Sequence, residues 1–145
     1  DAADQRDTRE ILFRGLDRRG SSSVVLSSVG ALESYVRSDR QVRERFIGVM
    51  EEHQISSSAR IRTAEALVPG SDNALKRRIV DAMEDVCERQ WEQQQRDRGR
   101  VLSARRQTID DAIDVVRQFD SAKAREMEQR YGRPPSLLRR IFGPH

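Results

Sequence analysis

This sequence of 145 residues is poor in the residue types that build covalent cross-links, metal centres and phosphate loops. A single cysteine, Cys87, excludes a disulfide within the chain. Only two histidines, His53 and His145, are present, and no three or four ligands occur at the spacing of a metal site. The eight glycines are scattered singly, so there is no glycine-rich phosphate-binding loop. We therefore expect a protein that is not an enzyme and that holds no cofactor or metal.

Long apolar runs are also missing from the sequence. No run approaches the roughly 20 apolar residues that a helix needs to cross a bilayer, so we expect no membrane span. No signal peptide is visible, and the sequence starts at Asp1 rather than at methionine. This start is compatible with processing or with a fragment. We expect an intracellular or organellar protein, and the sequence does not indicate which compartment.

Two groups of ionisable residues are candidates for chemistry, and both have a simpler interpretation. His53 follows Glu51 and Glu52 at the end of an expected helix, where a histidine interacts favourably with the helix dipole. The three aspartates between 110 and 114 could bind a divalent metal, but a solvated first helical turn explains them. Neither group has a defined nucleophile or a further ligand nearby, so we assign neither to catalysis.

Apolar residues recur at the 3.6-residue period of the α-helix in every patterned segment. Phe46, Ile79 and Val116 lie at the centres of such stripes, and Cys87 lies on one as a small apolar residue. No segment alternates over the length of a strand with turn residues on both sides. The pattern predicts an all-α protein, a helical bundle or a stack of helical pairs, with about six helices and a long C-terminal helix.

Capping patterns indicate where several helices begin. Asp7 with Glu10, and Ser38 with Gln41, resemble capping boxes. Thr108, followed by acidic residues, looks like the start of the C-terminal helix.

The chain is expected to form one helical domain over residues 1–131, followed by a Pro- and Arg-containing tail over 132–145. A single helix over 74–131 would be ~87 Å long, whereas a compact domain of this size is about 38 Å across. Gly99 would also destabilise a helix interior by about 1 kcal/mol. We therefore predict a kink or break at 96–108, with one projecting helix as the alternative.

Arginine is concentrated around this predicted break. Between 89 and 106 there are six arginines and two acidic residues, and lysine occurs in the whole chain only at 76 and 123. The planar guanidinium group pairs with carboxylates or phosphates, so this stretch is a candidate surface for either. A solvated charged face is the simpler alternative. The candidate partner- or phosphate-binding residues are Trp91, Arg96, Arg98, Arg100, Arg105, Arg106, Arg139 and Arg140.

Two stretches resemble known helical families. Residues 42–58, with Phe46, Met50 and Ile55, are similar to the second helix and exit of a pentatricopeptide unit, but cover under half of one unit. Residues 8–87 resemble the helical domain of the ATP-synthase delta subunit, in a helix ending LESYVRSD, then VRERF and a serine turn. The alanine-rich first helix and the later β-containing region of that family are absent. Neither resemblance establishes membership, and both are compatible with a docking subunit.

These observations favour a non-catalytic module for protein–protein interaction, a subunit or adaptor docking within a larger assembly. One alternative is an arginine-based binder of RNA or DNA, for which Arg96 to Arg106 would grip phosphates. Another is an effector or immunity-type protein that blocks a target protein. The SLLRRIF segment near the end of the chain, residues 136–142, is too short to anchor a membrane stably and fits docking to a partner better.

Overall fold

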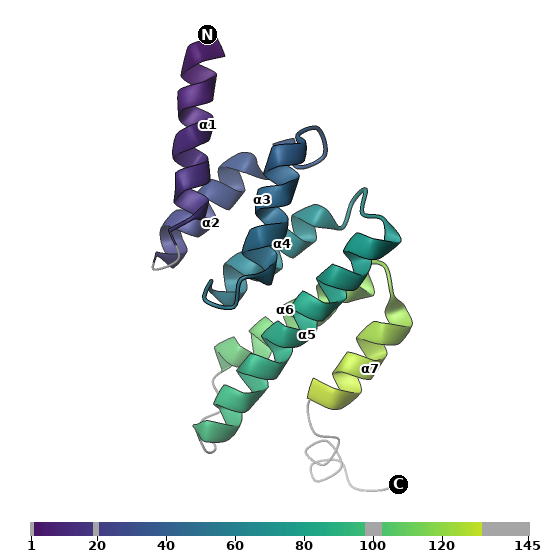
Figure 1. Cartoon of the computed structure of the whole chain (residues 1–145). Helices are drawn as coiled ribbons and strands as arrows, with labels where there is room; N and C mark the ends of the chain where they lie inside the picture. Colours follow the sequence, from purple (N-terminus) through teal and green to yellow (C-terminus); the bar gives the residue numbers. More distant parts are fainter. Residues whose placement is uncertain (1, 19–20, 98–102, 132–145) are drawn as a thin grey trace, which may run out of the picture. The chain divides into compact units, whose positions relative to one another are not determined.

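The computed structural model describes residues 2–18, 21–97 and 103–131, and the regular structure in these ranges is entirely helical (Figure 1). The all-α prediction is therefore confirmed. The described ranges hold seven α-helices and one short 3₁₀ helix: α1 (Ala2–Leu16), α2 (Ser22–Leu32), η1 (Glu33–Tyr35), α3 (Arg40–Glu51), α4 (Ser57–Leu67), α5 (Asn73–Arg96), α6 (Ser103–Arg117) and α7 (Ser121–Tyr131).

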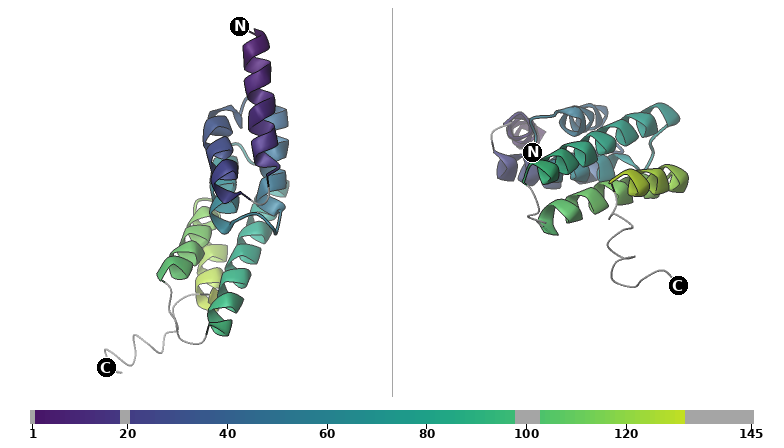
Figure 2. Two further views of the ribbon diagram at one scale, coloured as in Figure 1. Left: turned by 90° about the vertical axis from the view of Figure 1, so that its left-hand side faces the viewer. Right: turned by 90° about the horizontal axis from the view of Figure 1, so that it is seen from below.

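The helices form two compact units, Asp1–Met83 and Glu84–His145, with the boundary inside α5. In the first unit α3 packs against α4, α1 against α2, and α2 against α4, whereas α6 packs against α7 in the second unit. Figure 2 shows these helix pairs from two further sides. Neighbouring pairs of short helices agree with the expected bundle or helical-pair architecture. The prediction of one domain over 1–131 stays a prediction.

The apolar stripes read from the sequence form the cores of the two units. Phe46, Ile79 and Val116 are fully buried, as predicted, and so is Cys87. Among its described residues, the first unit also buries the charged side chain of Arg60 in α4, whose Nε donates to the carbonyl of Met50 at 2.8 Å. That carbonyl lies in the last turn of α3, where no backbone amide of the helix donates a hydrogen bond to it. Arg60 supplies this hydrogen bond and thereby stabilises a helix end inside the core.

Three helices begin elsewhere than the capping patterns predicted. α1 starts at Ala2 rather than near Asp7, and Thr8 lies inside it, with its hydroxyl donating to the Asp4 carbonyl. The cap of α3 is Asp39 rather than Ser38, because its carboxylate accepts from two backbone amides of the first turn. α6 begins at Ser103, five residues before the expected Thr108. Helix period therefore predicted these elements better than cap motifs did.

The predicted long C-terminal helix is divided into two, and the described ranges hold seven α-helices where about six were expected. α6 ends at Arg117 and α7 begins at Ser121. Asp120 causes the new start, since its carboxylate accepts from the Lys123 amide at 3.0 Å and its carbonyl accepts from the Ala124 amide. α5 ends at Arg96, so the helices between 74 and 131 are three separate elements.

Helices α1 and α2 approach each other closely at Gly15. A Cβ atom at this position would lie 2.0 Å from Ser28 Oγ and 3.2 Å from Ser28 Cβ. Ser28 is itself buried, and Leu16 beside Gly15 is buried as well. The C-terminal end of α1 is therefore packed firmly on α2, which matters for the groove described below.

Candidate functional site: a groove in the N-terminal unit

The structure places two of the predicted site residues inside the second unit's own ion pairs. Arg105 pairs with Asp97 at 2.6 Å, and Arg106 pairs with Asp110 at 3.5 Å. Arg106 Nη1 also donates to the carbonyl of Tyr131, at the end of α7, at 2.9 Å. Only 22% of the Arg105 side chain and 14% of the Arg106 side chain is exposed. Both guanidinium groups thus join helices together and present little surface to a phosphate.

Of the other six predicted site residues, the structure describes only two, Arg96 and Trp91. Arg96 is exposed at the C-terminal end of α5, and Trp91, five residues earlier, is partly buried. Four more, Arg98, Arg100, Arg139 and Arg140, lie outside the described residues. The arginine-rich site therefore stays a prediction.

The one cysteine is an unreactive core residue. Its Sγ donates to the carbonyl of Ile109 at 3.8 Å, and burial raises the pKa of the Cys87 thiol to about 12. Burial also raises the pKa of the Tyr131 hydroxyl. Within the described ranges, no group of three or more His, Cys, Asp or Glu side chains is placed to hold a metal ion. No helix in those ranges is long and apolar enough to span a membrane.

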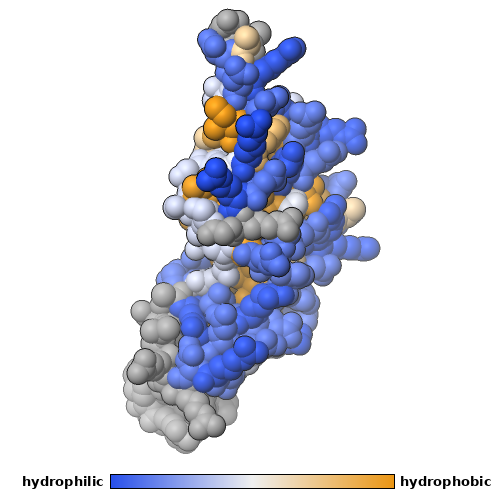
Figure 3. All heavy atoms as spheres, turned by 60° about the vertical axis from the view of Figure 1, so that its left-hand side comes forward, coloured by the Kyte–Doolittle hydropathy of each residue, from blue (hydrophilic) through white to orange (hydrophobic). Residues whose placement is uncertain are grey.

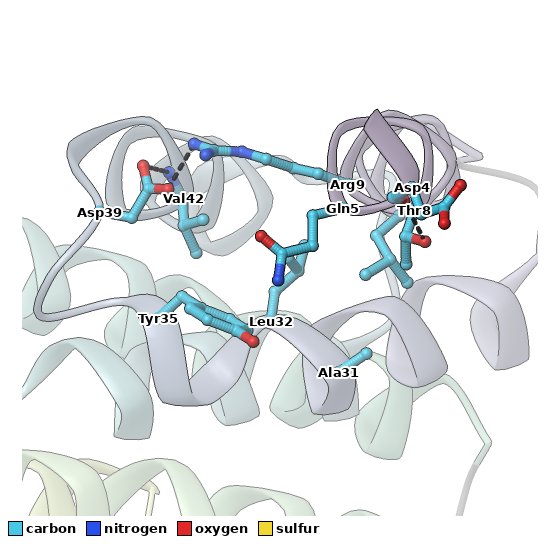
Figure 4. Close-up of a pocket in the computed structure, with 10 residues that line it drawn as sticks. Asp4, Gln5, Thr8, Arg9, Ala31, Leu32, Tyr35, Asp39 and Val42 are labelled. Carbon is cyan, nitrogen blue, oxygen red and sulfur yellow. Dashed lines mark hydrogen bonds and ion pairs between the residues drawn. The ribbon is translucent and has the colours of Figure 1, made fainter. Parts of the chain in front are cut away.

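A groove opens on the surface of the first unit between the N-terminal half of α1, the end of α2 with η1, and the start of α3 (Figure 4). Its volume of about 520 Å³ is within the usual range for ligand sites. It is an open groove rather than an enclosed cavity. The lining residues are Asp4, Gln5, Thr8, Arg9 and Leu12 from α1, Ala31 and Leu32 from α2, Tyr35 from η1, and Asp39 and Val42 at the start of α3.

Arg9 spans the top of this groove from α1 to α3 (Figure 4). Its guanidinium group forms an ion pair with Asp39 and donates to the side-chain oxygen of Gln41 at 3.0 Å. Asp39 also caps α3, accepting from the amides of Gln41 at 2.9 Å and Val42 at 3.3 Å. The same carboxylate thus fixes both the start of α3 and the position of Arg9.

The arginine bridge continues along α1 through an aromatic ring. The Arg9 and Arg45 guanidinium carbons each lie 5.3 Å from the centre of the Phe13 ring, within the range of a cation–π contact. Arg45, from α3, then pairs with Asp17 at 3.0 Å. These polar contacts hold α1 beside α3 along one edge of the groove.

The floor of the groove is apolar. Tyr35 is 55% exposed, and its ring lies on the floor with Leu32, below Gln5 (Figure 4). Ile11, on α1 outside the groove lining, is 65% exposed. Figure 3 shows apolar side chains beside the first helix on a face that is otherwise mostly hydrophilic. The groove therefore has apolar residues at its floor and polar side chains at its rim.

Sequence reasoning missed this groove because four separate elements build it. The α1 residues that line it recur at helical spacing, but most are polar and resemble a solvated face. An aromatic residue close to a helix boundary, Tyr35, was the one local signal.

Comparison with known proteins adds no identification. Neither a protein-family model, nor a curated protein sequence, nor a solved structure matches this chain. The resemblances to a pentatricopeptide unit and to the ATP-synthase delta subunit therefore gain no support from these comparisons.

Proposed function

We propose that this protein is a non-catalytic helical interaction module, a subunit or adaptor of a larger assembly, and that its groove receives a segment of a partner protein. The observation that carries the proposal is the open groove with its apolar floor. A small molecule in a typical binding pocket is buried over most of its surface, which an open groove does not provide. A side chain of a docking helix or peptide requires only such a groove.

The groove lining also defines the chemistry of the partner segment. The exposed Tyr35 ring and the half-buried Leu12 suit an aliphatic side chain, whereas Leu32 and Val42 are buried and add little exposed surface to the lining. Arg9 and Asp39 neutralise each other, so Asp4 leaves the lining with a net negative charge. The expected partner is therefore a segment with leucine-like residues next to lysine or arginine.

The proposal is tested with a fluorescein-labelled amphipathic peptide of about 12 residues, ~18 Å as a helix, that carries leucines flanked by arginines. The change Ala31→Trp fills the groove from the exposed face of α2, whereas Ser27→Trp adds the same bulk on that helix outside the lining. We expect Ala31→Trp to abolish the anisotropy change and Ser27→Trp to preserve it. Equal binding by both variants, or no binding by the unchanged protein, contradicts the proposal.

The charge preference has its own matched pair of variants. Asp4 lines the groove, and Asp7 is an exposed acid on the same helix outside the lining. Asp4→Asn should lower the affinity for the arginine-containing peptide by roughly two- to fivefold, since one exposed ion pair contributes about 0.5–1 kcal/mol. Asp7→Asn should have no effect, and a peptide with glutamates in place of arginines should bind less well than the original.

The two other functions receive less support. Arg105 and Arg106, central to the nucleic-acid alternative, are engaged with carboxylates of the second unit. An effector or immunity-type protein would use the same groove against a target, so identification of the partner distinguishes it from an assembly subunit.

A further inference from the structure

The N-terminal half of α1 is attached to the first unit in an unusual way. The side chains from Ala3 to Thr8 are all exposed, and the first half-buried side chain is that of Arg9. Firm packing begins only at the other end of the helix, with Gly15 against Ser28 and the buried Leu16. The N-terminal half is therefore held against α3 by polar contacts rather than by an apolar core.

Arg9 joins this half to α3 through a hydrogen bond to Gln41 and an ion pair with Asp39. The side chains of Arg9 and Asp39 are partly exposed, so water and salt compete with their ion pair. An exposed ion pair contributes far less than a buried apolar contact, and it can open and close without unfolding the helix core. The same pair lies across the top of the groove (Figure 4).

We infer that the N-terminal half of α1 is a hinged lid over the groove, that the Gly15 end is its hinge, and that Arg9 and Asp39 form its clasp. Opening of the clasp moves Gln5 and Thr8 away from the floor, exposes the buried Leu32 and uncovers more of the Tyr35 ring. A docking segment enters the groove in this open state. The role of the lid in docking rests on the function proposed above, whereas the motion itself does not.

The motion is measured in the full chain by the distance between two spin labels within the first unit, at Arg6→Cys on α1 and Ser58→Cys on α4. Both positions are exposed. Cys87 is buried and its thiol has a pKa of about 12, so the native cysteine does not react with the label. With Arg9 and Asp39 unchanged, the distribution of spin-label distances should have one narrow main peak and a small population at other distances.

Two variants open the clasp by different routes. Arg9→Met removes the guanidinium but keeps the apolar stem and the helix preference. Asp39→Asn removes the charge but keeps the cap of α3, because asparagine caps as well as aspartate. Each should raise the open population by roughly two- to fivefold, the change expected for one half-exposed ion pair. The double variant should resemble Arg9→Met, because Arg9→Met already removes the ion pair with Asp39, together with the Gln41 hydrogen bond and the Phe13 contact.

Arg78→Met is the matched control, because Arg78 of α5 pairs with Glu51 of α3 in the same unit without touching α1. It should leave the distance distribution unchanged. Distributions for Arg9→Met and Asp39→Asn that equal the unchanged one overturn the lid, and so does equal broadening by Arg78→Met.

Peptide binding separates the lid from the function it serves. If the distances respond to the clasp but no variant binds the leucine–arginine peptide, the lid stands and the docking function fails. If the peptide binds in the groove but the distances do not respond, the lid is refuted and the docking function stands.

Discussion

The change Gly15→Ala tests the packing that anchors α1, and the structure sets two opposing effects. Alanine is favoured over glycine in a helix interior by about 0.8–1.0 kcal/mol. Against this, the new Cβ would lie 2.0 Å from Ser28 Oγ and 3.2 Å from Ser28 Cβ. The hydroxyl can rotate away, but Ser28 is buried and its Cβ must move by a few tenths of an ångström. Overpacking of this kind costs about 1–3 kcal/mol, so we expect a net destabilisation of about 1 kcal/mol.

The comparison that isolates the clash uses Gly48→Ala. Gly48 lies inside α3, and a Cβ there would meet nothing within 4 Å. Only the helix preference acts, so Gly48→Ala should stabilise the protein by up to about 1 kcal/mol. The effect of Gly15→Ala should become less unfavourable in a Ser28→Gly background, where the blocking side chain is gone.

The assay is urea unfolding followed by far-ultraviolet circular dichroism, with the midpoints compared at constant slope. Equal stabilisation by Gly15→Ala and Gly48→Ala would show that α1 does not approach α2 at Gly15, and the hinge would then have no basis.

Three further predictions follow from the cores and the ion pairs. Phe46→Ala should lower the free energy of unfolding by ~3–5 kcal/mol in urea titrations, because the ring is fully buried; a loss under about 1 kcal/mol would contradict the core assignment. Folding raises the pKa of the Cys87 thiol from 9.0 to about 12, so the thiol of the unfolded chain ionises at lower pH than that of the folded chain. The free energy of unfolding should therefore fall as the pH rises above about 9, and Cys87→Ala should remove this part of the pH dependence. Arg106→Gln should lower the melting temperature of the second unit, because it breaks the contacts to Asp110 and Tyr131. An unchanged melting temperature together with a loss of nucleic-acid binding would instead support the phosphate-binding alternative.

The sequence predicted the parts of the fold that depend on neighbouring residues. Phe46, Ile79 and Val116 are buried as expected, since the helical period alone determines which face of each helix is apolar. The division of the C-terminal segment was missed, because no glycine or proline marks it and the cap at Asp120 resembles an ordinary surface acid.

The candidate site depends on contacts between residues far apart in the sequence, and these were not predictable. Arg9 and Asp39 meet only because α1 and α3 lie side by side. Arg105 pairs with Asp97 across the end of one helix and the start of the next, so a run of arginines that looked free is partly neutralised. Charge composition was visible in the sequence, but the pairing of those charges required the fold.

The central claim, that the groove is the docking site, is tested most directly by photo-crosslinking to the leucine–arginine peptide. Tyr35 and Ile11 are both exposed large apolar residues of the first unit, and only Tyr35 lines the groove. With p-benzoylphenylalanine in place of Tyr35, irradiation should give a covalent peptide adduct that excess unlabelled peptide suppresses. The same probe in place of Ile11 should give none. Equal adducts at both positions, or an adduct only at Ile11, would contradict docking in the groove.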